Sequence, residues 1–277
     1  MALGGNPVFN SRNFREQTGA AQNGHSPAGG VAVDPRQQGQ TLSPEQLQQM
    51  YTQPSAGPAQ TGRMTYGDVI NKTVLCFIGI LAGAVVGWQL PGLMMIGLIA
   101  GLVLGLVNAF KKEPSPVLIM LYALAEGLFI GGLSGVLEGM YPGIAVQAVI
   151  ATLSVFAVTL VLYRSGKYRA TPKMTKMFMI AMAAYAVFSL VNLGLMLFGV
   201  TDSMFGLRSG WIGLAIGALA VLLATYALVL DFTSVQQGVE QGAPAKYSWT
   251  AAFGLTVTMV WLYVEILRII AILRGDE

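Results

Sequence analysis

Seven long apolar blocks, separated by short polar or proline-containing links, follow a polar N-terminal stretch in this sequence. Each block is close to the roughly 20 residues that a helix needs to cross the hydrocarbon core of a bilayer. The pattern predicts an all-α fold, that of a polytopic membrane protein built as a seven-transmembrane-helix bundle. The predicted helices span about residues 69–90, 92–110, 116–138, 142–163, 174–198, 209–231 and 250–273.

The N-terminal stretch is rich in Gly, Gln, Pro, Asn and Ser. Such a composition buries too little apolar surface to offset the entropy of ordering the chain, so we expect residues 1–63 to form a disordered polar tail. Residues 64–277 then form the transmembrane domain. Within the tail, a short helix can begin with Ser43 as N-cap, Pro44 at the first position and Gln46 closing a capping box.

Composition and charge agree with a membrane protein. The chain is 54% hydrophobic and 10% charged, with a mean hydropathy of +0.61, whereas soluble domains carry about 25% charged residues. The net charge of +3 comes from basic residues scattered over short links, which does not suggest nucleic-acid binding.

The basic link between residues 164 and 176 predicts a cytoplasmic N-terminus, although Arg268 and Arg274 weakly oppose this orientation. No basic stretch followed by an apolar core opens the chain, so we expect no cleaved signal peptide.

Several kinds of chemistry lack the residues they need. The one cysteine, Cys76, allows no intrachain disulfide, and the one histidine, His25, lies in the polar tail. Ser134 sits in a Gly-x-Ser-Gly sequence, but no histidine within the spans can activate it. The seventh span has no lysine for a retinal Schiff base, and no Gly-x-Gly-Asp accompanies Asp231. We therefore expect no enzymatic activity and no bound cofactor.

Glycines recur every four residues in the first three spans, which places them on one face of each helix. Small residues on one face allow two helices to approach closely in a membrane. We therefore expect these spans to pack tightly through their glycines, which are Gly79, Gly83 and Gly87, then Gly97, Gly101 and Gly105, then Gly127, Gly131, Gly135 and Gly139.

Four ionisable residues, Glu126, Asp231, Glu265 and Arg268, lie at membrane depth in the predicted spans, and each costs about 2.5–3.5 kcal/mol at a helix centre on insertion scales. Asp231 ends the sixth span, on the same face as a seam of small residues at 213, 217, 220, 224 and 227. This predicts that Asp231 points into the bundle, with an interfacial carboxylate solvated by cytoplasm as the alternative. Glu265 shares a face of the seventh span with Thr258, Trp261 and Arg268. Glu265 and Arg268, three residues apart, can pair, so this seam is either functional or a structural ion pair.

Two further polar positions have open interpretations. Glu126 lies near the middle of the third span, beside its glycine stripe. It is either a group on a permeation or proton pathway or an acid that burial keeps neutral. Tyr185, Ser189 and Asn192 form a polar face on the fifth span, which is typical of hydrogen bonding between helices.

The sequence resembles the Bax inhibitor (transmembrane Bax inhibitor motif) family, in particular its bacterial branch, over about residues 66–274. The resemblance rests on the seven spans, on Leu230-Asp231-Phe232 at the end of the sixth, and on residues 261–267, Trp-Leu-Tyr-Val-Glu-Ile-Leu, in the seventh. It implies a bundle with the last helix at its centre. It also implies a proton-regulated calcium leak in the bacterial plasma (inner) membrane.

By this resemblance, the pH sensor and gate is an acidic pair from the sixth and seventh spans, Asp231 and Glu265, with Arg268 tuning it. Glu265 replaces the usual Asp, and the stretch between the two acids is several residues longer than usual. If these residues lengthen the seventh helix, Glu265 lies too deep to meet Asp231; if they form a hinge near 242–254, the contact survives. Two carboxylates within about 4–6 Å would titrate as a unit, and their oxygens would also suit calcium.

The leading hypothesis is therefore a pH-sensitive calcium leak, with the bilayer, protons and calcium as its partners and Glu126 as a pathway candidate. The alternative is a non-conducting regulator that binds other membrane proteins, such as a quality-control protease. A third hypothesis is a proton-coupled transporter of a small solute.

Overall fold

The computed structural model describes residues 62–166, 169–201, 203 and 205–275, all of which belong to the compact unit formed by residues 56–277. Within the described residues, seven helices are long and apolar enough to cross a membrane. The predicted all-α, seven-helix class is confirmed. Residues 1–61, which include the short helix predicted to begin at Ser43, lie outside the described part.

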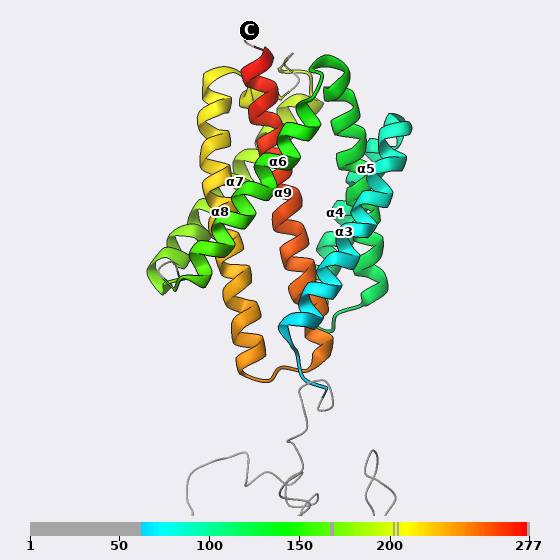
Figure 1. The fold of residues 1–277 in the computed structure, drawn as a ribbon. Helices are drawn as coiled ribbons and strands as arrows, with labels where there is room; N and C mark the ends of the chain where they lie inside the picture. The colour runs from blue at the N-terminus through cyan, green and yellow to red at the C-terminus, as the bar shows by residue number, and fades with distance from the viewer. Residues whose placement is uncertain (1–61, 167–168, 202, 204, 276–277) are drawn as a thin grey trace, which may run out of the picture. The chain divides into compact units, whose positions relative to one another are not determined.

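The helices follow one another through short links (Figure 1). The first span is α3, Tyr66–Gln89, and the second is the short helix η2, Pro91–Leu93, continued by α4, Met94–Phe110. The third and fourth spans are α5, Pro116–Met140, and α6, Ile144–Arg164. The fifth is α7, Pro172–Leu197. The last two are α8, Gly210–Glu240, preceded by η3, Gly206–Arg208, and α9, Ser248–Gly275, preceded by η4, Ala245–Tyr247.

The residues at the helix ends explain where several spans begin. Thr65 accepts a hydrogen bond from the Asp68 amide at 3.1 Å and caps α3, and Thr171 caps α7 in the same way. Pro116 and Pro172 occupy the first positions of α5 and α7, where a missing N–H costs nothing and a fixed φ favours the helix. The breaks predicted from the sequence therefore coincide with local chain chemistry.

The prediction that Asp231 ends the sixth helix is wrong, because α8 continues to Glu240. The residues after Asp231 are polar but suit a helix. The hydroxyls of Thr233 and Ser234 donate to the carbonyls of Val229 and Leu230, one turn earlier, at 2.7 and 2.9 Å, which satisfies them inside the helix. The chain turns only at Gly242, whose φ of 66° suits glycine.

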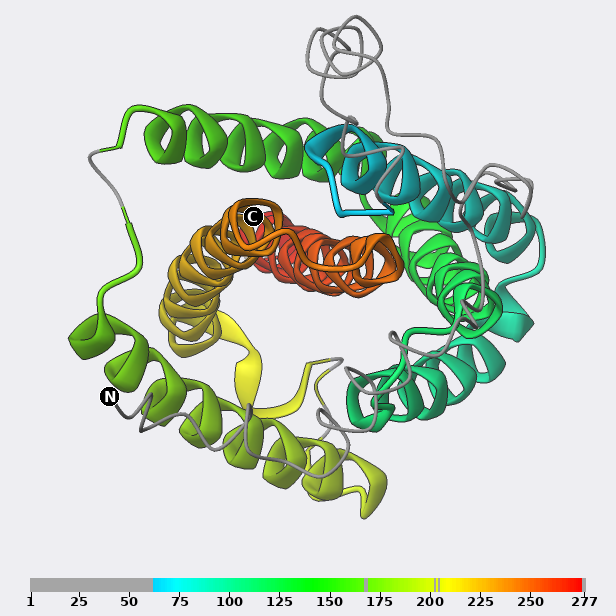
Figure 2. The same ribbon diagram turned by 90° about the horizontal axis from the view of Figure 1, so that it is seen from below.

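The last helix lies at the centre of the bundle. Of its most apolar stretch, 72% is buried, compared with 6% for α7. Figure 2 shows α9 surrounded by α3, α5, α6 and α8, with α7 further out. The central position of α9, which the family resemblance implies, is what brings its polar residues into contact with several other elements.

The glycine stripes of α3, α4 and α5 form helix contacts, as predicted, except at Gly139, where an added Cβ would meet nothing within 4 Å. A Cβ on Gly83 would lie 2.3 Å from the Leu124 carbonyl oxygen, and one on Gly131 would lie 2.2 Å from the Ala84 carbonyl oxygen. A Cβ on Gly97 would lie 2.6 Å from a backbone nitrogen of α5. These separations leave room only for a hydrogen, so α5 sits in close backbone contact with α3 on one side and α4 on the other.

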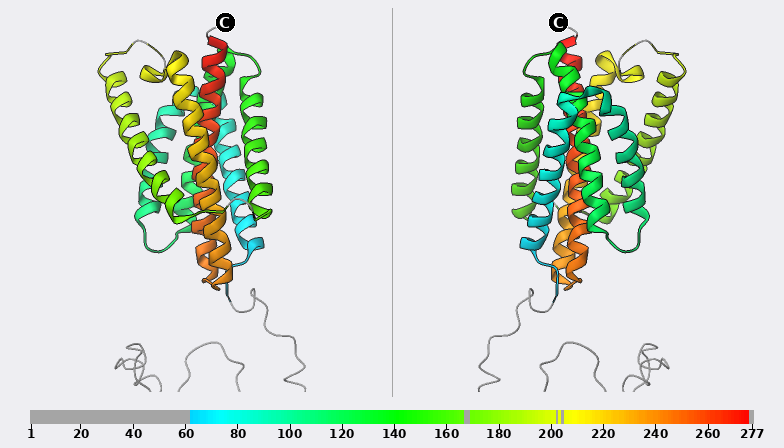
Figure 3. Two further views of the ribbon diagram at one scale, coloured as in Figure 1. Left: turned by 90° about the vertical axis from the view of Figure 1, so that its left-hand side faces the viewer. Right: turned by 90° about the vertical axis from the view of Figure 1, so that its right-hand side faces the viewer.

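We call the side of the bundle on which α3 begins the lower side, at the bottom of Figure 1, and the opposite side the upper side. In the two side views of Figure 3, α8 and α9 extend from the lower side to the upper side of the bundle. On the lower side, the chain just before α3 pairs with the α8–α9 link: Met64 N–H donates to the Ala243 carbonyl at 2.7 Å, and Ala245 N–H to the Gly62 carbonyl at 2.8 Å. Lys72 also donates to the Ala245 carbonyl. The link between the last two helices is thereby fixed to the start of the first.

Candidate functional site

Asp231 points from α8 to the central helix, as its small-residue face predicts. Its Oδ2 accepts a hydrogen bond from the Thr258 hydroxyl of α9 at 2.7 Å. Its Oδ1 lies 3.2 Å from the position that a Cβ on Gly254 would occupy. Gly254 and Thr258, one helical turn apart on α9, therefore provide the space and the donor that receive this carboxylate.

A cavity of about 440 Å³ connects Asp231 with the lower side of the bundle. Its wall carries the polar side chains of Asn108, Ser234 and Thr250. Asp231 and Lys111 are the charged residues among those that line it. Asp231 is thus partly buried between helices and reachable from one side of the membrane, which combines the two alternatives that the sequence left open for it.

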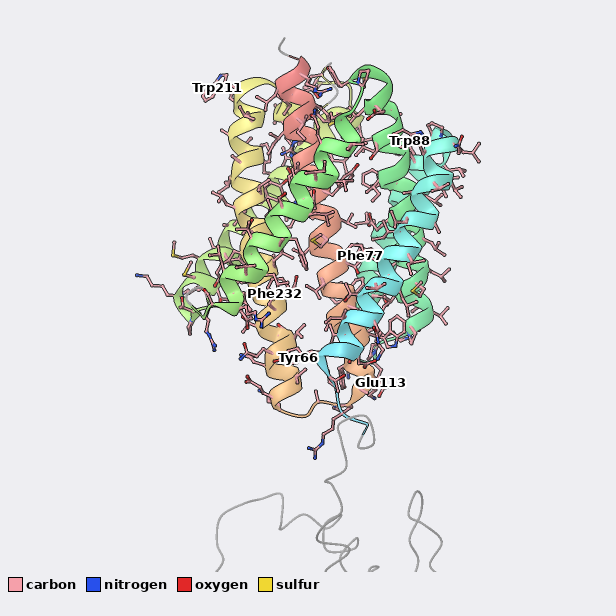
Figure 4. All side chains as sticks on the ribbon, viewed as in Figure 1. Tyr66, Phe77, Trp88, Glu113, Trp211 and Phe232 are labelled. Carbon is pink, nitrogen blue, oxygen red and sulfur yellow. The ribbon has the colours of Figure 1, made fainter. Side chains whose placement is uncertain are left out.

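An exposed ion pair lies on the same lower side. Lys246, just before α9, donates to the Glu113 carboxylate in the α4–α5 link at 2.8 Å, and Figure 4 marks Glu113 at the lower end of the bundle. This hydrogen bond and the positive charge of Lys246 lower the pKa of Glu113 from its ordinary value. The pair joins the α4–α5 link to the start of the central helix.

A second polar cluster lies higher in the bundle, around Glu265 of α9. Glu265 and Arg268 form an ion pair three residues apart, as the sequence predicts. Arg208 of η3 approaches the same carboxylate, with its Nη1 3.6 Å from Oε1. Glu265 is 2% exposed and Arg268 5%. Two guanidinium groups and one carboxylate therefore meet in a nearly dry environment, where they interact more strongly than in water.

Aromatic side chains complete this cluster. The Tyr185 hydroxyl of α7 donates to Glu265, and the Trp261 indole, one turn earlier on α9, donates to it at 3.3 Å. The Arg208 guanidinium lies over the rings of Tyr185 and Phe188, with its carbon 4.8 and 5.6 Å from the ring centroids. Cation–π contacts of this kind stabilise a charge that has lost its water.

The polar face of α7 serves interhelical hydrogen bonding, as predicted. Besides Tyr185, Ser189 accepts a hydrogen bond from Arg208. Asn192 holds η3 through its backbone: its Oδ1 accepts from Leu207 N–H at 2.6 Å and its Nδ2 donates to the Phe205 carbonyl at 3.2 Å. Because α7 buries little apolar surface, these polar contacts are what position η3, and with it Arg208.

Asp231 and Glu265 are not in contact. Asp231 bonds to Thr258, which lies seven residues before Glu265, about 10 Å along the helix axis. Trp261 lies on the same face between the two levels. Of the two arrangements that the sequence allows, the structure therefore has the one in which a continuous seventh helix carries Glu265 too far from Asp231. The two acids do not share a proton in this structure.

Glu126 belongs to neither group. Its Oε1 lies 2.8 Å from the position of a Cβ on Gly101, so the carboxyl side chain packs between α5 and α4. Among the described side chains, it forms no ion pair with Arg208 or Arg268, and it does not line the lower cavity. The glycine stripe of α4 thus provides the space that this acid needs.

Sequence reasoning missed Arg208 and the specific role of Thr258. Arg208 falls in the link between the predicted spans 174–198 and 209–231, and its distance of 57 residues from Glu265 (265 minus 208) gives no periodic signal. One clue existed: it is a basic residue in a link on the opposite side of the membrane from the basic link at 164–176. Helical periodicity predicts the face of the last helix on which Thr258 lies, but it does not predict its partner, Asp231.

The described residues contain no group of three or more His, Cys, Asp or Glu side chains placed to hold a metal ion. The lower cavity offers one carboxylate, from Asp231, with the hydroxyls of Thr258 and Ser234 nearby. Calcium prefers six to eight oxygen ligands. This arrangement can attract a cation at the end of a water-accessible cavity, but it does not form a closed binding cage.

Comparison with known proteins gives one family. The sequence model of a family described as Bax inhibitor 1 like matches residues 6–275, nearly the whole chain. A search of curated proteins found no match.

Proposed function

Because the chain belongs to the Bax inhibitor 1 like family, we propose that it is a pH-sensitive calcium leak of the bacterial inner membrane, with Asp231 as the carboxylate for which protons and calcium compete. The observation that carries this proposal is the position of Asp231, which lies in the wall of the lower cavity and bonds to the central helix through Thr258. A charge at this position acts on an entering cation and on the contact between α8 and α9 at the same time.

The chemistry of a carboxylate suits both ions. Ionised Asp231 offers hard oxygen ligands to calcium and accepts the hydroxyl proton of Thr258. A proton bound to the same oxygens removes the charge that attracts the cation. With one carboxylate and few other oxygens around it, the site would hold calcium briefly, which suits a leak better than storage.

We call the group formed by Arg208, Glu265 and Arg268 the upper cluster. In this proposal it is the closed end of the pathway. Arg208 and Arg268 carry two positive charges and Glu265 one negative charge, so the cluster has an excess of one positive charge close to the centre of the bundle. A cation that has passed Asp231 would meet this repulsion. Opening then requires Arg208 to move away with η3, which the polar face of α7 holds in place.

Asp231 and Glu265 thus act at two levels rather than as one pair. Protonation of Asp231 alters the Thr258 contact at the lower level, and a shift of α9 changes the position of Glu265 and Arg268 at the upper level. We further propose that the lower side faces the cytoplasm, since the basic links at 111–112 and 164–176 both open on that side.

The test is calcium flux into liposomes that contain the purified protein and a calcium-sensitive dye, measured between pH 5 and pH 8. We expect flux that depends on pH, and loss of that dependence in Asp231→Asn. The matched control is Glu240→Gln, which neutralises an exposed carboxylate on the same helix and should leave the pH profile unchanged. A folded protein without flux at any pH would reject the leak and favour the non-conducting regulator.

A further inference from the structure

A second cavity, of about 500 Å³, lies at membrane depth between α3, α5, α6 and α9. It exists because α3 packs on α5 and α9 while α6 packs on α8 and α9, so α3 and α6 do not pack closely against each other. Figure 1 shows α9 behind the space between α3 and α6. The wall of the cavity is formed mainly by apolar side chains, among them Phe77, Leu81, Val149, Leu153, Met259 and Val260.

The few polar side chains of this cavity satisfy one another or their own helix. The Ser134 hydroxyl lies 2.7 Å from the Tyr263 hydroxyl, and it also donates to the Ile130 carbonyl. The Thr152 hydroxyl donates to the Ala148 carbonyl at 2.7 Å. Water needs two to four polar partners in a buried site, and these walls have little to offer. An empty space of this size would also forfeit the dispersion contacts of every side chain that lines it.

The cavity opens on the lipid-facing surface of the bundle. At its edge, Leu81 of α3 is 65% exposed and Leu153 of α6 is 54% exposed. Next to them, Val85 and Ile150 continue the same apolar surface on the outside of the two helices. The surface that contacts hydrocarbon therefore runs into the cavity without a polar boundary.

We propose that this cavity holds one acyl chain of a membrane lipid, which enters between α3 and α6 and lies against the central helix. Trp88 forms one end of the cavity, near the upper end of α3 (Figure 4). Tryptophan is enriched where hydrocarbon meets headgroups, so the chain would enter from the upper leaflet and extend toward Phe77.

The position of the chain on α9 gives it a structural role. With 3.6 residues per turn, Met259, Val260 and Tyr263 lie on the opposite side of α9 from Thr258 and Glu265. The acyl chain would thus be the packing partner for the back of the helix whose front carries the polar contacts. This inference concerns what supports α9 and stands whether or not the protein conducts calcium.

The experiment uses the full chain in liposomes that contain a phospholipid with a diazirine near the end of one acyl chain. After irradiation, mass spectrometry of peptides locates the attached lipid. We expect labelling of α9 near Met259 and Val260, which are 5% and 7% exposed and can be reached by lipid only through the cavity. Labelling of Ile99, which is 59% exposed on α4, serves as an internal standard.

Two matched variants of α6 test the route. Val149→Trp fills the cavity, and we expect a several-fold loss of α9 labelling relative to Ile99. Val146→Trp places the same side chain one turn earlier, at a lipid-facing position outside the cavity, and should label as the unmodified protein does.

Two results would overturn the proposal. The first is the absence of lipid on α9 in the unmodified protein while Ile99 is labelled, which needs no variant to fold. The second is equal α9 labelling in Val149→Trp and Val146→Trp, which would show that lipid reaches these residues by another route.

Discussion

The Glu265 carboxylate on α9 faces the guanidinium of Arg208, which lies just before α8, with Oε1 and Nη1 3.6 Å apart. Arg268 pairs with the same carboxylate from the next turn of α9. One negative charge therefore balances part of two positive charges in a place that water hardly reaches. Both guanidinium groups therefore share this single carboxylate.

Removal of the Glu265 charge should destabilise the protein strongly. Glu265→Gln removes the carboxylate that Arg208 and Arg268 share and leaves two positive charges close together. Breaking a buried ion pair costs about 3–5 kcal/mol. The free energy of unfolding, measured by SDS titration in mixed micelles, should fall by about this amount.

Asp68→Asn is the matched control for that measurement. Asp68 pairs with Lys72 at 2.7 Å, but the aspartate side chain is 33% exposed at the start of α3. Partly solvated pairs contribute less than about 1 kcal/mol. Equal losses in the free energy of unfolding in the two variants would show that burial adds nothing to the stabilising effect of the Glu265 ion pairs.

Much of the fold could be predicted from the sequence, because the bilayer imposes lengths and periodicities that short segments reveal. The seven apolar blocks gave the seven spans, and spacing of four gave the glycine faces that bring α5 against α3 and α4. The Glu265–Arg268 pair was predictable for the same reason, since residues three apart on one helix are neighbours.

Contacts between helices were not predictable in this way. Hydropathy ends a span where residues become polar, but α8 continues through Thr233 and Ser234 because their hydroxyls bond within the helix. The partner of Asp231 depends on how far α9 is shifted along α8, and that shift places Thr258, not Glu265, at its level. Arg208 reaches the site through the path of a link, which carries no periodic pattern.

The Thr258 hydroxyl should influence the pH dependence of flux. It donates to ionised Asp231, and a hydrogen bond to the charged form favours that form. Thr258→Val removes the donor, so Asp231 takes up a proton more readily and the flux profile should move toward higher pH. Liposome flux between pH 5 and pH 8 measures this shift.

Thr256→Val offers the same substitution two residues earlier on α9. The Thr256 hydroxyl donates to the Ala252 carbonyl of its own helix and does not contact Asp231. We expect its flux profile to match that of the unmodified protein. A shift of the same size in both variants would assign the effect to the loss of any hydroxyl in α9, and not to the Asp231 contact.

Close packing of α3 on α5 should make Gly131 intolerant of any side chain. A Cβ at this position would lie 2.5 Å from Ala84 Cα and closer still to its carbonyl oxygen. We expect Gly131→Ala to lower the free energy of unfolding by about 1–3 kcal/mol, as overpacking usually does. Gly139→Ala, on the same helix with nothing within 4 Å of the added carbon, should be neutral or slightly stabilising. SDS titration of both variants would refute the close contact if they were equally stable.

Asn192 should control flux without touching the pathway itself. Its amide holds the backbone of Leu207 and Phe205, the residues that precede Arg208 along the chain. Asn192→Leu keeps a buried side chain of similar size but frees η3, so Arg208 loses its fixed position at the closed end of the pathway. We expect higher calcium flux at every pH, together with a loss of about 1–3 kcal/mol from the unsatisfied backbone groups.

A general loss of stability would not reproduce this combination. Asn192→Asp retains an acceptor for Leu207 N–H and should restore part of the low flux, because the position of η3 depends mainly on that short hydrogen bond. Gln147→Leu, an exposed polar-to-apolar change on α6, should leave flux unchanged. If Asn192→Leu were less stable but no leakier than the unmodified protein, Arg208 would not block the pathway, and the upper cluster would serve to hold α7 and η3 to the central helix.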